Sequence, residues 1–229
     1  MVVCLLNLGE RDTHFARYTA QATAGDKICL ANLLKQPERE KIMHYSIAMG
    51  LGLPQRLIMK QEIAQSLGII GTTELSLIEL FKNPNLKANF EKGRAYQNLD
   101  PIIQEGSSKY KNVGINVILS DRSFRMMQLD RISYIVEYPY QANLMAKKLS
   151  LQIITFKIKE HVPFIEAFVT CAKTDFGLQV INKVSQFIRA NKATPEYRKM
   201  TTSLSKYLDE NTFTSLMDLR ETVFIKMDK

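Results

Sequence analysis

Short apolar runs alternate with amphipathic stretches along the whole chain, and this alternation is typical of an α/β protein. The apolar runs predict strands at residues 2–7, 28–34, 53–60, 87–90, 113–119, 133–137, 151–158 and 164–172. The amphipathic stretches predict helices at residues 13–24, 76–81, 99–105, 123–129 and 139–148. Two more helices are expected after the last strand. The first of them should bury Leu178, Ile181, Val184, Phe187 and Ile188 on one face.

Glycine and proline residues mark several of these boundaries. Gly25 follows the helix predicted at 13–24, where a left-handed residue commonly ends a helix. Pro139 and Pro195 suit the first turns of the helices that follow them, because a proline there removes no helical hydrogen bond.

The composition is that of a globular protein. Of the 229 residues, 45% are hydrophobic and 24% are charged, and this length allows one large domain or two lobes with their own cores. The longest apolar run, at residues 2–6, is strand-sized, so no membrane insertion is predicted. No basic region precedes an apolar stretch at the N-terminus, and no secretory signal is predicted in this chain.

The chain carries a formal net charge of +8, which raises the question of a nucleic-acid partner. The excess of Lys and Arg is spread over the sequence, and its dense pairs, such as Lys147-Lys148, are short and not interleaved with aromatic residues. A basic solvated surface is therefore expected, and no nucleic-acid partner.

The sequence lacks the common motifs of cofactor and nucleophile sites. It contains no glycine-rich phosphate loop and no nucleophile elbow, and Gly-Leu-Gly at residues 50–52 is only a fragment of a dinucleotide motif. His14, His44 and His161 are scattered and are expected to be structural or surface residues. No cofactor, no metal site and no catalytic residue is predicted.

The three cysteines, Cys4, Cys29 and Cys171, are far apart and form no Cys-x-x-Cys pair, so a zinc site is not expected. Cys29 and Cys171 lie in apolar segments, and by default they are expected to be buried small hydrophobic residues. The sequence leaves open whether these two are paired in a disulfide.

The first candidate for ligand binding is the polar turn after the strand at 28–34. Gln36 and Pro37 open a short helix whose first turn carries Arg39. Open α/β sheets bind ligands at the carboxyl ends of their strands, and a guanidinium there can hold a carboxylate through two hydrogen bonds. The alternative is that Arg39 pairs with a neighbouring Glu in solvent.

The second candidate lies at the end of the strand at 133–137. Glu137 is followed by Tyr138, Pro139 and Tyr140. The carboxylate is suited to an ammonium or hydroxyl group of a ligand, and the tyrosines can supply an apolar wall or hydroxyls. The alternative is an exposed glutamate at a strand end beside packing tyrosines.

Four segments, in this order, resemble the type II periplasmic solute-binding proteins of family 3, which includes polar amino-acid receptors. They are residues 29–41 with Tyr45-Ser46, Gly93-Arg94-Ala95-Tyr96, residues 130–139, and residues 168–174 with Gly177. The resemblance implies an α/β fold of two lobes that close on a ligand by a hinge motion. One lobe would be residues 1–57 plus 169–229, and the other residues 58–168.

The resemblance also implies a ligand site. Arg39 would hold the α-carboxylate of the ligand and Glu137 its amino group, and the helix start at Ala95-Tyr96 would add backbone N–H donors. Two departures bear on this site. Ala95 and Gln97 stand where the family has Ser and Gly. A hydroxyl contact to the ligand is therefore expected to be missing, and Arg94 is expected to matter more for binding than is usual in the family.

Two further departures concern Leu34, where amino-acid receptors often carry Ser or Thr, and Ser133, where the strand usually has Asp. The chain also enters the family pattern at its second strand, residues 2–7, so an N-terminal strand and a signal peptide are expected to be missing.

The predicted function is that of an extracytoplasmic, by resemblance periplasmic, solute-binding protein without enzymatic activity. It would capture a small carboxylate-bearing, amino-acid-like solute between its lobes and deliver it to an ABC-type permease or a sensor. One alternative is an interaction-only homologue that has lost its ligand. The other is a dehydratase-like enzyme on the same fold, with Glu137 as its acid or base.

Overall fold

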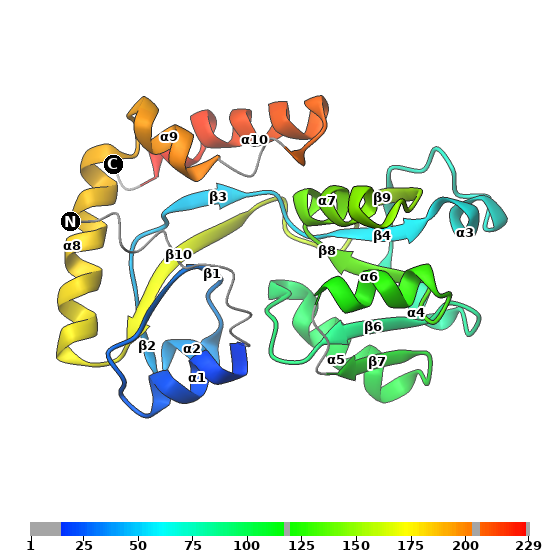
Figure 1. The fold of residues 1–229 in the computed structure, drawn as a ribbon, viewed down its shortest axis with the longest axis horizontal. Coiled ribbons are helices and arrows are strands. Elements are labelled where there is room, and N and C mark those ends of the chain that lie inside the picture. The colour runs from blue at the N-terminus through cyan, green and yellow to red at the C-terminus, as the bar shows by residue number, and fades with distance from the viewer. Residues whose placement is uncertain (1–14, 117–119, 203–206, 228–229) are drawn as a thin grey trace. The chain divides into compact units, whose positions relative to one another are not determined.

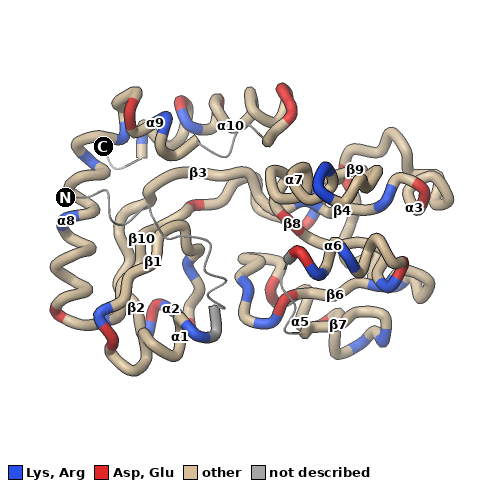
Figure 2. The backbone as a smooth tube through the Cα atoms, in the orientation of Figure 1, with Lys and Arg blue, Asp and Glu red and all other residues tan. Residues whose placement is uncertain are grey.

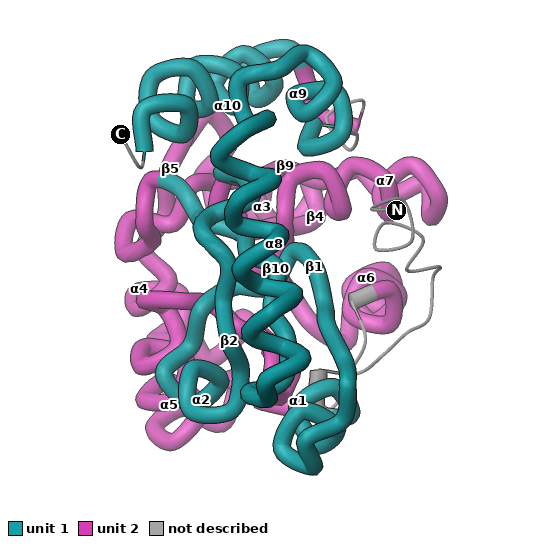
Figure 3. The backbone as a smooth tube through the Cα atoms, turned by 90° about the vertical axis from the view of Figure 1, so that its left-hand side faces the viewer, with its two compact units in different colours: residues 1–52, 164–203, 210–229 teal, residues 53–163, 204–209 magenta. Residues whose placement is uncertain are grey.

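The structure, a computed structural model, describes residues 15–116, 120–202 and 207–227 (Figure 1). The strand predicted at 2–7 lies outside the described residues. The chain divides into two compact units, shown in Figure 3: unit 1 comprises residues 1–52, 164–203 and 210–229, and unit 2 comprises residues 53–163 and 204–209. The predicted lobe boundaries, at 57/58 and 168/169, lie a few residues after these divisions.

Unit 1 is built on β10 (Ile165–Ala172), the long strand with which its other strands pair. All of these pairs are antiparallel, and the partners are β1 (Cys29–Leu33), β2 (Met43–Tyr45) and β3 (Gly50–Gly52). The helical elements of this unit are α1 (Phe15–Thr23), α2 (Pro37–Glu40), α8 (Asp175–Asn191), α9 (Pro195–Thr201), α10 (Glu210–Thr222) and η4 (Phe224–Lys226).

Local signals explain where these elements begin and end. Gly25, at φ +78°, follows α1 as predicted. The Thr174 hydroxyl caps α8 by accepting a hydrogen bond from the Gly177 N–H at 3.1 Å. Gly177 has no room for a side chain, because a Cβ there would lie 2.0 Å from the carbonyl oxygen of Ala172.

A disulfide joins β1 to β10. Cys29 and Cys171 lie directly opposite each other in the antiparallel pair, and their sulfurs are bonded. The sequence left this pairing open. Of the two residues expected to be buried, Cys171 is fully buried and Cys29 is partly buried. Neither residue carries a sequence signal for the pairing, which arises because β10 returns to β1 from 142 residues further along the chain.

The predicted buried face of α8 is correct only in part. Ile181 and Ile188 are buried, whereas Leu178 is 44% exposed and Phe187 is 38% exposed. The helix instead turns Ser185 inward, where its hydroxyl accepts a hydrogen bond from the Ile47 N–H at 3.2 Å. The buried face of α8 therefore includes the polar Ser185 and leaves out Leu178 and Phe187.

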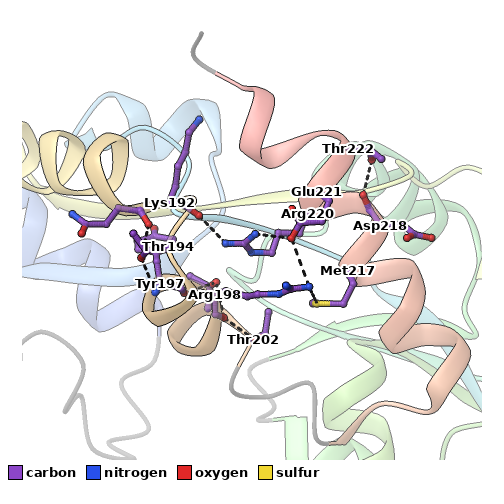
Figure 4. Close-up of polar contacts among 12 residues, drawn as sticks. Lys192, Thr194, Tyr197, Arg198, Thr202, Met217, Asp218, Arg220, Glu221 and Thr222 are labelled. Atoms are coloured by element: carbon purple, nitrogen blue, oxygen red, sulfur yellow. Dashed lines mark hydrogen bonds and ion pairs between the residues drawn. The ribbon is translucent and has the colours of Figure 1, made fainter.

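Polar contacts of the C-terminal helices hold them to the end of α8 (Figure 4). Arg220, buried on α10, donates from Nη2 to the carbonyl oxygen of Lys192 at 2.7 Å and from Nη1 to Glu221 Oε1 at 2.9 Å. Lys192 Nζ in turn donates to the carbonyl oxygens of Phe224 and Met227. These contacts tie α10 and η4 into unit 1.

Unit 2 is a six-stranded sheet in the order β5-β9-β4-β8-β6-β7. Its strands are β4 (Arg56–Lys60), β5 (Glu74–Leu75), β6 (Ala88–Glu91), β7 (Val113–Asn116), β8 (Tyr134–Glu137) and β9 (Ile153–Ile158). β4 runs antiparallel to both of its neighbours, so the other five strands are parallel to one another.

The helices of unit 2 pack against this sheet. They are α3 (Gln61–Ser66), α4 (Leu77–Lys82), η2 (Gln97–Leu99), α5 (Asp100–Lys109), α6 (Ser120–Gln128) and α7 (Pro139–Leu149). The larger core cluster of the unit includes Leu57, Met59, Phe90 and Phe156, all on strands. The predicted α/β fold is confirmed, and the strands and helices predicted within the described residues lie within a few residues of those observed.

Figure 2 shows Lys and Arg distributed along the described chain in both units, intermixed with Asp and Glu. Within the residues that the structure covers, no helix has the length and apolar character needed to cross a membrane.

Candidate functional site

The parallel strands of unit 2 end at one edge of its sheet, and polar side chains gather there. β6 ends at Glu91 and β8 at Glu137, and Arg56 at the start of antiparallel β4 lies opposite Glu137. Because ligands of open α/β sheets bind outside the carboxyl ends of parallel strands, this edge is the candidate site of unit 2.

Arg94 and Glu137 form a two-pronged ion pair at this edge. Arg94 Nη1 donates to Glu137 Oε2 at 2.7 Å, and its Nη2 donates to Glu137 Oε1. The backbone N–H of Tyr138 also donates to Oε1, at 2.8 Å. The side chain of Glu137 is 3% exposed and that of Arg94 is 12% exposed. The alternative of an exposed strand-end glutamate is therefore wrong.

The turn after β6 places Arg94 for this contact. Gly93 adopts a φ of +82°, which lets the chain turn back over the strand end, and the Arg94 N–H donates to the carbonyl oxygen of Glu91 at 3.3 Å. The guanidinium lies over two rings, 5.6 Å from the centroid of Tyr96 and 5.4 Å from that of Tyr138.

Charge and burial set the ionisation of this cluster. Burial acts to lower the pKa of Arg94, but the Glu137 carboxylate outweighs it and raises the pKa, so the guanidinium stays charged. Burial raises the pKa of Tyr96 to about 12, and burial also raises the pKa of Tyr138. Both phenols therefore keep their protons at neutral pH.

Backbone and side-chain groups of Tyr96 are already engaged within unit 2. Its N–H donates to Asp100 Oδ1 at 3.0 Å, and its hydroxyl oxygen accepts the Glu91 N–H at 3.1 Å. The carbonyl oxygen of Ala95 accepts a hydrogen bond from Gln55 Nε2 at 3.2 Å.

A second series of polar contacts, which the sequence did not predict, is joined to the same cluster by hydrogen bonds. Gln55 Nε2 also donates to the Tyr138 hydroxyl at 3.2 Å, and Gln55 Oε1 lies 2.9 Å from His161 Nε2. The other ring nitrogen of His161 lies 2.9 Å from Asn98 Oδ1. Gln55 and His161 are 106 positions apart in the sequence, and neither belongs to a motif that would have singled it out.

His161 is expected to make the stability of unit 2 depend on pH. Burial, with a smaller contribution from Arg56, lowers its pKa from 6.5 to about 4. The unfolded chain therefore binds a proton at a higher pH than the folded chain. The contribution of His161 to the stability of unit 2 should be complete above pH 6.5 and should be lost progressively as the pH drops from 6.5 towards 4.

Urea unfolding at several pH values tests this expectation. His161→Gln, which does not titrate, should show a smaller loss of stability between pH 6.5 and 4 than the wild type. An equal loss in the two proteins would assign the acid sensitivity to other groups.

Arg39, the predicted carboxylate ligand, lies in unit 1. It is 5% exposed, and its Nη1 donates to the carbonyl oxygen of Leu34 at 3.4 Å. Burial raises the pKa values of Tyr18 and Tyr45. This effect exceeds the lowering caused by the positive charge of Arg39. The alternative of an arginine exposed to solvent is wrong, because Arg39 is buried. At the exposed end of the helix, Lys41 pairs with Glu38.

The sequence-predicted residues thus fall into two groups. Gln36, the residue before α2, and Arg39 belong to unit 1. Unit 2 brings five others together at one sheet edge: Arg94, Ala95, Tyr96, Glu137 and Tyr138. A ligand site that combines the two groups stays a prediction.

Unit 1 also contains a pocket of about 560 Å³ with a mixed lining that includes His44, Ser46, Glu166, Asn182 and Arg189. None of the sequence-predicted site residues lines it. In the described part of the chain, no group of three or more His, Cys, Asp or Glu side chains is placed to hold a metal ion.

Comparison by sequence identifies no relative: no protein-family model matches the chain, and no curated protein matches it significantly. Comparison of structures finds many. The chain is similar to the substrate-binding protein of an amino-acid ABC transporter, with a TM-score of 0.60, 18% identity, and 82% of this chain and 75% of that chain covered.

Two other similar structures differ in role. One is a histidine kinase sensor domain with similarity to periplasmic binding proteins, with a TM-score of 0.63, 9% identity, and 85% and 76% of the two chains covered. The other is an ancestral amino-acid-binding protein, a precursor of cyclohexadienyl dehydratase, with a TM-score of 0.58, 16% identity, and 83% and 73% covered. The chain therefore has the mixed α/β fold of the periplasmic amino-acid-binding proteins, as its sequence predicted.

Proposed function

We propose that this chain is an extracytoplasmic solute-binding protein that captures a small carboxylate-bearing solute. The observation that carries the proposal is Arg39, a buried guanidinium at the turn that follows β1. Its planar fork matches the two oxygens of a carboxylate, and similar folds occur in amino-acid-binding proteins. A guanidinium so largely removed from water gives each hydrogen bond to a carboxylate more weight than it has at the surface.

Unit 2 would supply the second half of the site through the cluster around Glu137. Tyr138 offers a hydroxyl, and Arg94 and Glu137 offer fixed charges at the carboxyl edge of the parallel strands. Closure of two units on a ligand by a hinge is the motion expected of such a fold.

An oxidising compartment agrees with this proposal. Disulfides such as Cys29–Cys171 form and persist in the periplasm and outside the cell, and they are rare in the cytosol. The partner would be an ABC permease or a sensor, since similar folds include a transporter component and a sensor domain.

Catalysis is a weaker candidate, although one similar protein preceded a dehydratase. A general acid or base must be free to exchange a proton with the substrate. The Glu137 carboxylate instead holds both Nη atoms of Arg94 and the Tyr138 N–H. The same pairing favours a second candidate function, that of an interaction-only protein. The carboxylate that would receive a ligand is already paired with Arg94.

Arg39→Lys tests the proposal. It keeps the charge and removes the fork, so binding of the best ligand from a panel of amino acids, dicarboxylates and small peptides should weaken at least tenfold. Isothermal titration calorimetry gives the affinities, and circular dichroism checks the fold. Arg17→Lys, at an exposed position of α1, is the matched control. Equal affinities in Arg39→Lys and the wild type would remove Arg39 from the site.

A further inference from the structure

The carboxylate of Glu137 is already hydrogen-bonded to groups of its own chain. It accepts hydrogen bonds from both Nη atoms of Arg94, one of them at 2.7 Å, and from the Tyr138 N–H at 2.8 Å. The Glu137 side chain is 3% exposed. A ligand ammonium would need the same oxygens and would have to displace the guanidinium that holds them.

Arg94 is held in place from other sides as well. Glu91 Oε2 lies 3.7 Å from its Nη1, and the rings of Tyr96 and Tyr138 both contact the guanidinium. Displacing it would leave a largely buried charge without its two-pronged partner, which is among the most costly changes in a protein interior. An incoming ammonium would gain only the hydrogen bonds that Arg94 gave up.

The nearby Tyr138 hydroxyl suits an oxygen atom on the ligand. It accepts a hydrogen bond from Gln55 Nε2 at 3.2 Å, and a phenol that accepts one hydrogen bond can still donate its own proton to an acceptor. Carbonyl and hydroxyl oxygens accept such a proton, whereas an ammonium group has no lone pair to do so.

We propose that Arg94 is a built-in substitute for a ligand ammonium, so that the site selects carboxylates that lack an α-ammonium group, such as 2-oxo acids, 2-hydroxy acids and plain dicarboxylates. This inference rests on the proposed function, because it names the ligand class of the same site. It makes Arg94 a specificity-determining residue.

Matched pairs of ligands test the inference on the full chain. The pairs are L-glutamate with 2-oxoglutarate, and L-alanine with pyruvate and lactate, titrated by calorimetry. The wild type is expected to bind the member without an ammonium group at least tenfold more tightly. Tighter or equal binding of the amino acid would overturn the inference.

Arg94→Ser gives a second, independent readout. It frees the Glu137 carboxylate to receive an ammonium, so the order within each pair should reverse in favour of the amino acid. Arg94→Lys keeps a cation beside Glu137 and should keep the wild-type order, although with weaker binding of both members. If Arg94→Ser does not fold, the affinities of the wild type for the matched ligand pairs still test the inference.

The two proposals fail in different ways. Wild-type binding of an amino acid as tight as, or tighter than, that of its counterpart, weakened at least tenfold in Arg39→Lys, would keep the proposed function and overturn the role of Arg94. No binding of any pair member to the wild type or to a folded Arg94→Ser variant would overturn both. No binding to the wild type, with amino-acid binding gained in Arg94→Ser, would support Arg94 as the internal occupant and would contradict solute capture by the natural chain.

Discussion

Glu137→Ala is expected to destabilise unit 2 by about 3–5 kcal/mol, the usual cost of removing one partner from a buried ion pair. The guanidinium of Arg94 would stay buried after losing both of its hydrogen bonds to the carboxylate. The carboxylate of Glu91 lies 3.7 Å from Nη1, farther away than the oxygens of Glu137.

Urea unfolding followed by circular dichroism measures this loss. The double variant Arg94→Met, Glu137→Leu removes both charges and should be more stable than Glu137→Ala, because no unpaired charge stays behind. Glu79→Gln, which breaks an exposed pair with Lys82, is the control and should leave the midpoint unchanged. A double variant less stable than Glu137→Ala would show that the cluster stabilises unit 2 by packing rather than by charge pairing.

Removal of the Cys29–Cys171 disulfide is expected to cost unit 1 about 2–4 kcal/mol. The bond joins segments 142 positions apart, so it removes much conformational freedom from the unfolded chain. Urea unfolding of Cys29→Ala, Cys171→Ala under oxidising conditions gives the difference from the wild type.

The effect of reductant separates the disulfide from side-chain packing. Dithiothreitol should lower the midpoint of the wild type and leave that of the double variant unchanged. If the oxidised wild type and the double variant unfold at the same urea concentration, the disulfide does not stabilise unit 1.

Elements with strong local signals were predictable from the sequence. β1, β8 and α7 are each an apolar or amphipathic run that ends at a polar residue, glycine or proline. The short strands β2 and β5 were not predicted, because strands of three and two residues owe their existence to pairing with β10 and β9 rather than to their own sequence.

The candidate site was predictable only residue by residue. The position of Glu137 at the end of a strand follows from the local pattern, but its pairing with Arg94, 43 positions away, depends on the order of β6 and β8 in the sheet. The roles of Gln55 and His161 depend in the same way on β4 and β9. No local pattern encodes such contacts, since tertiary structure alone brings these residues together.

The central claim, capture of a small carboxylate, is tested most directly by the thermal unfolding of the wild-type chain with amino acids, their 2-oxo and 2-hydroxy counterparts, dicarboxylates and small peptides. A ligand present at about 100 times its dissociation constant stabilises a one-site protein by about 2.7 kcal/mol. We predict a rise in the melting temperature with at least one carboxylate that grows with its concentration and is diminished in Arg39→Lys. A cooperative transition that no member of the panel shifts would contradict solute capture.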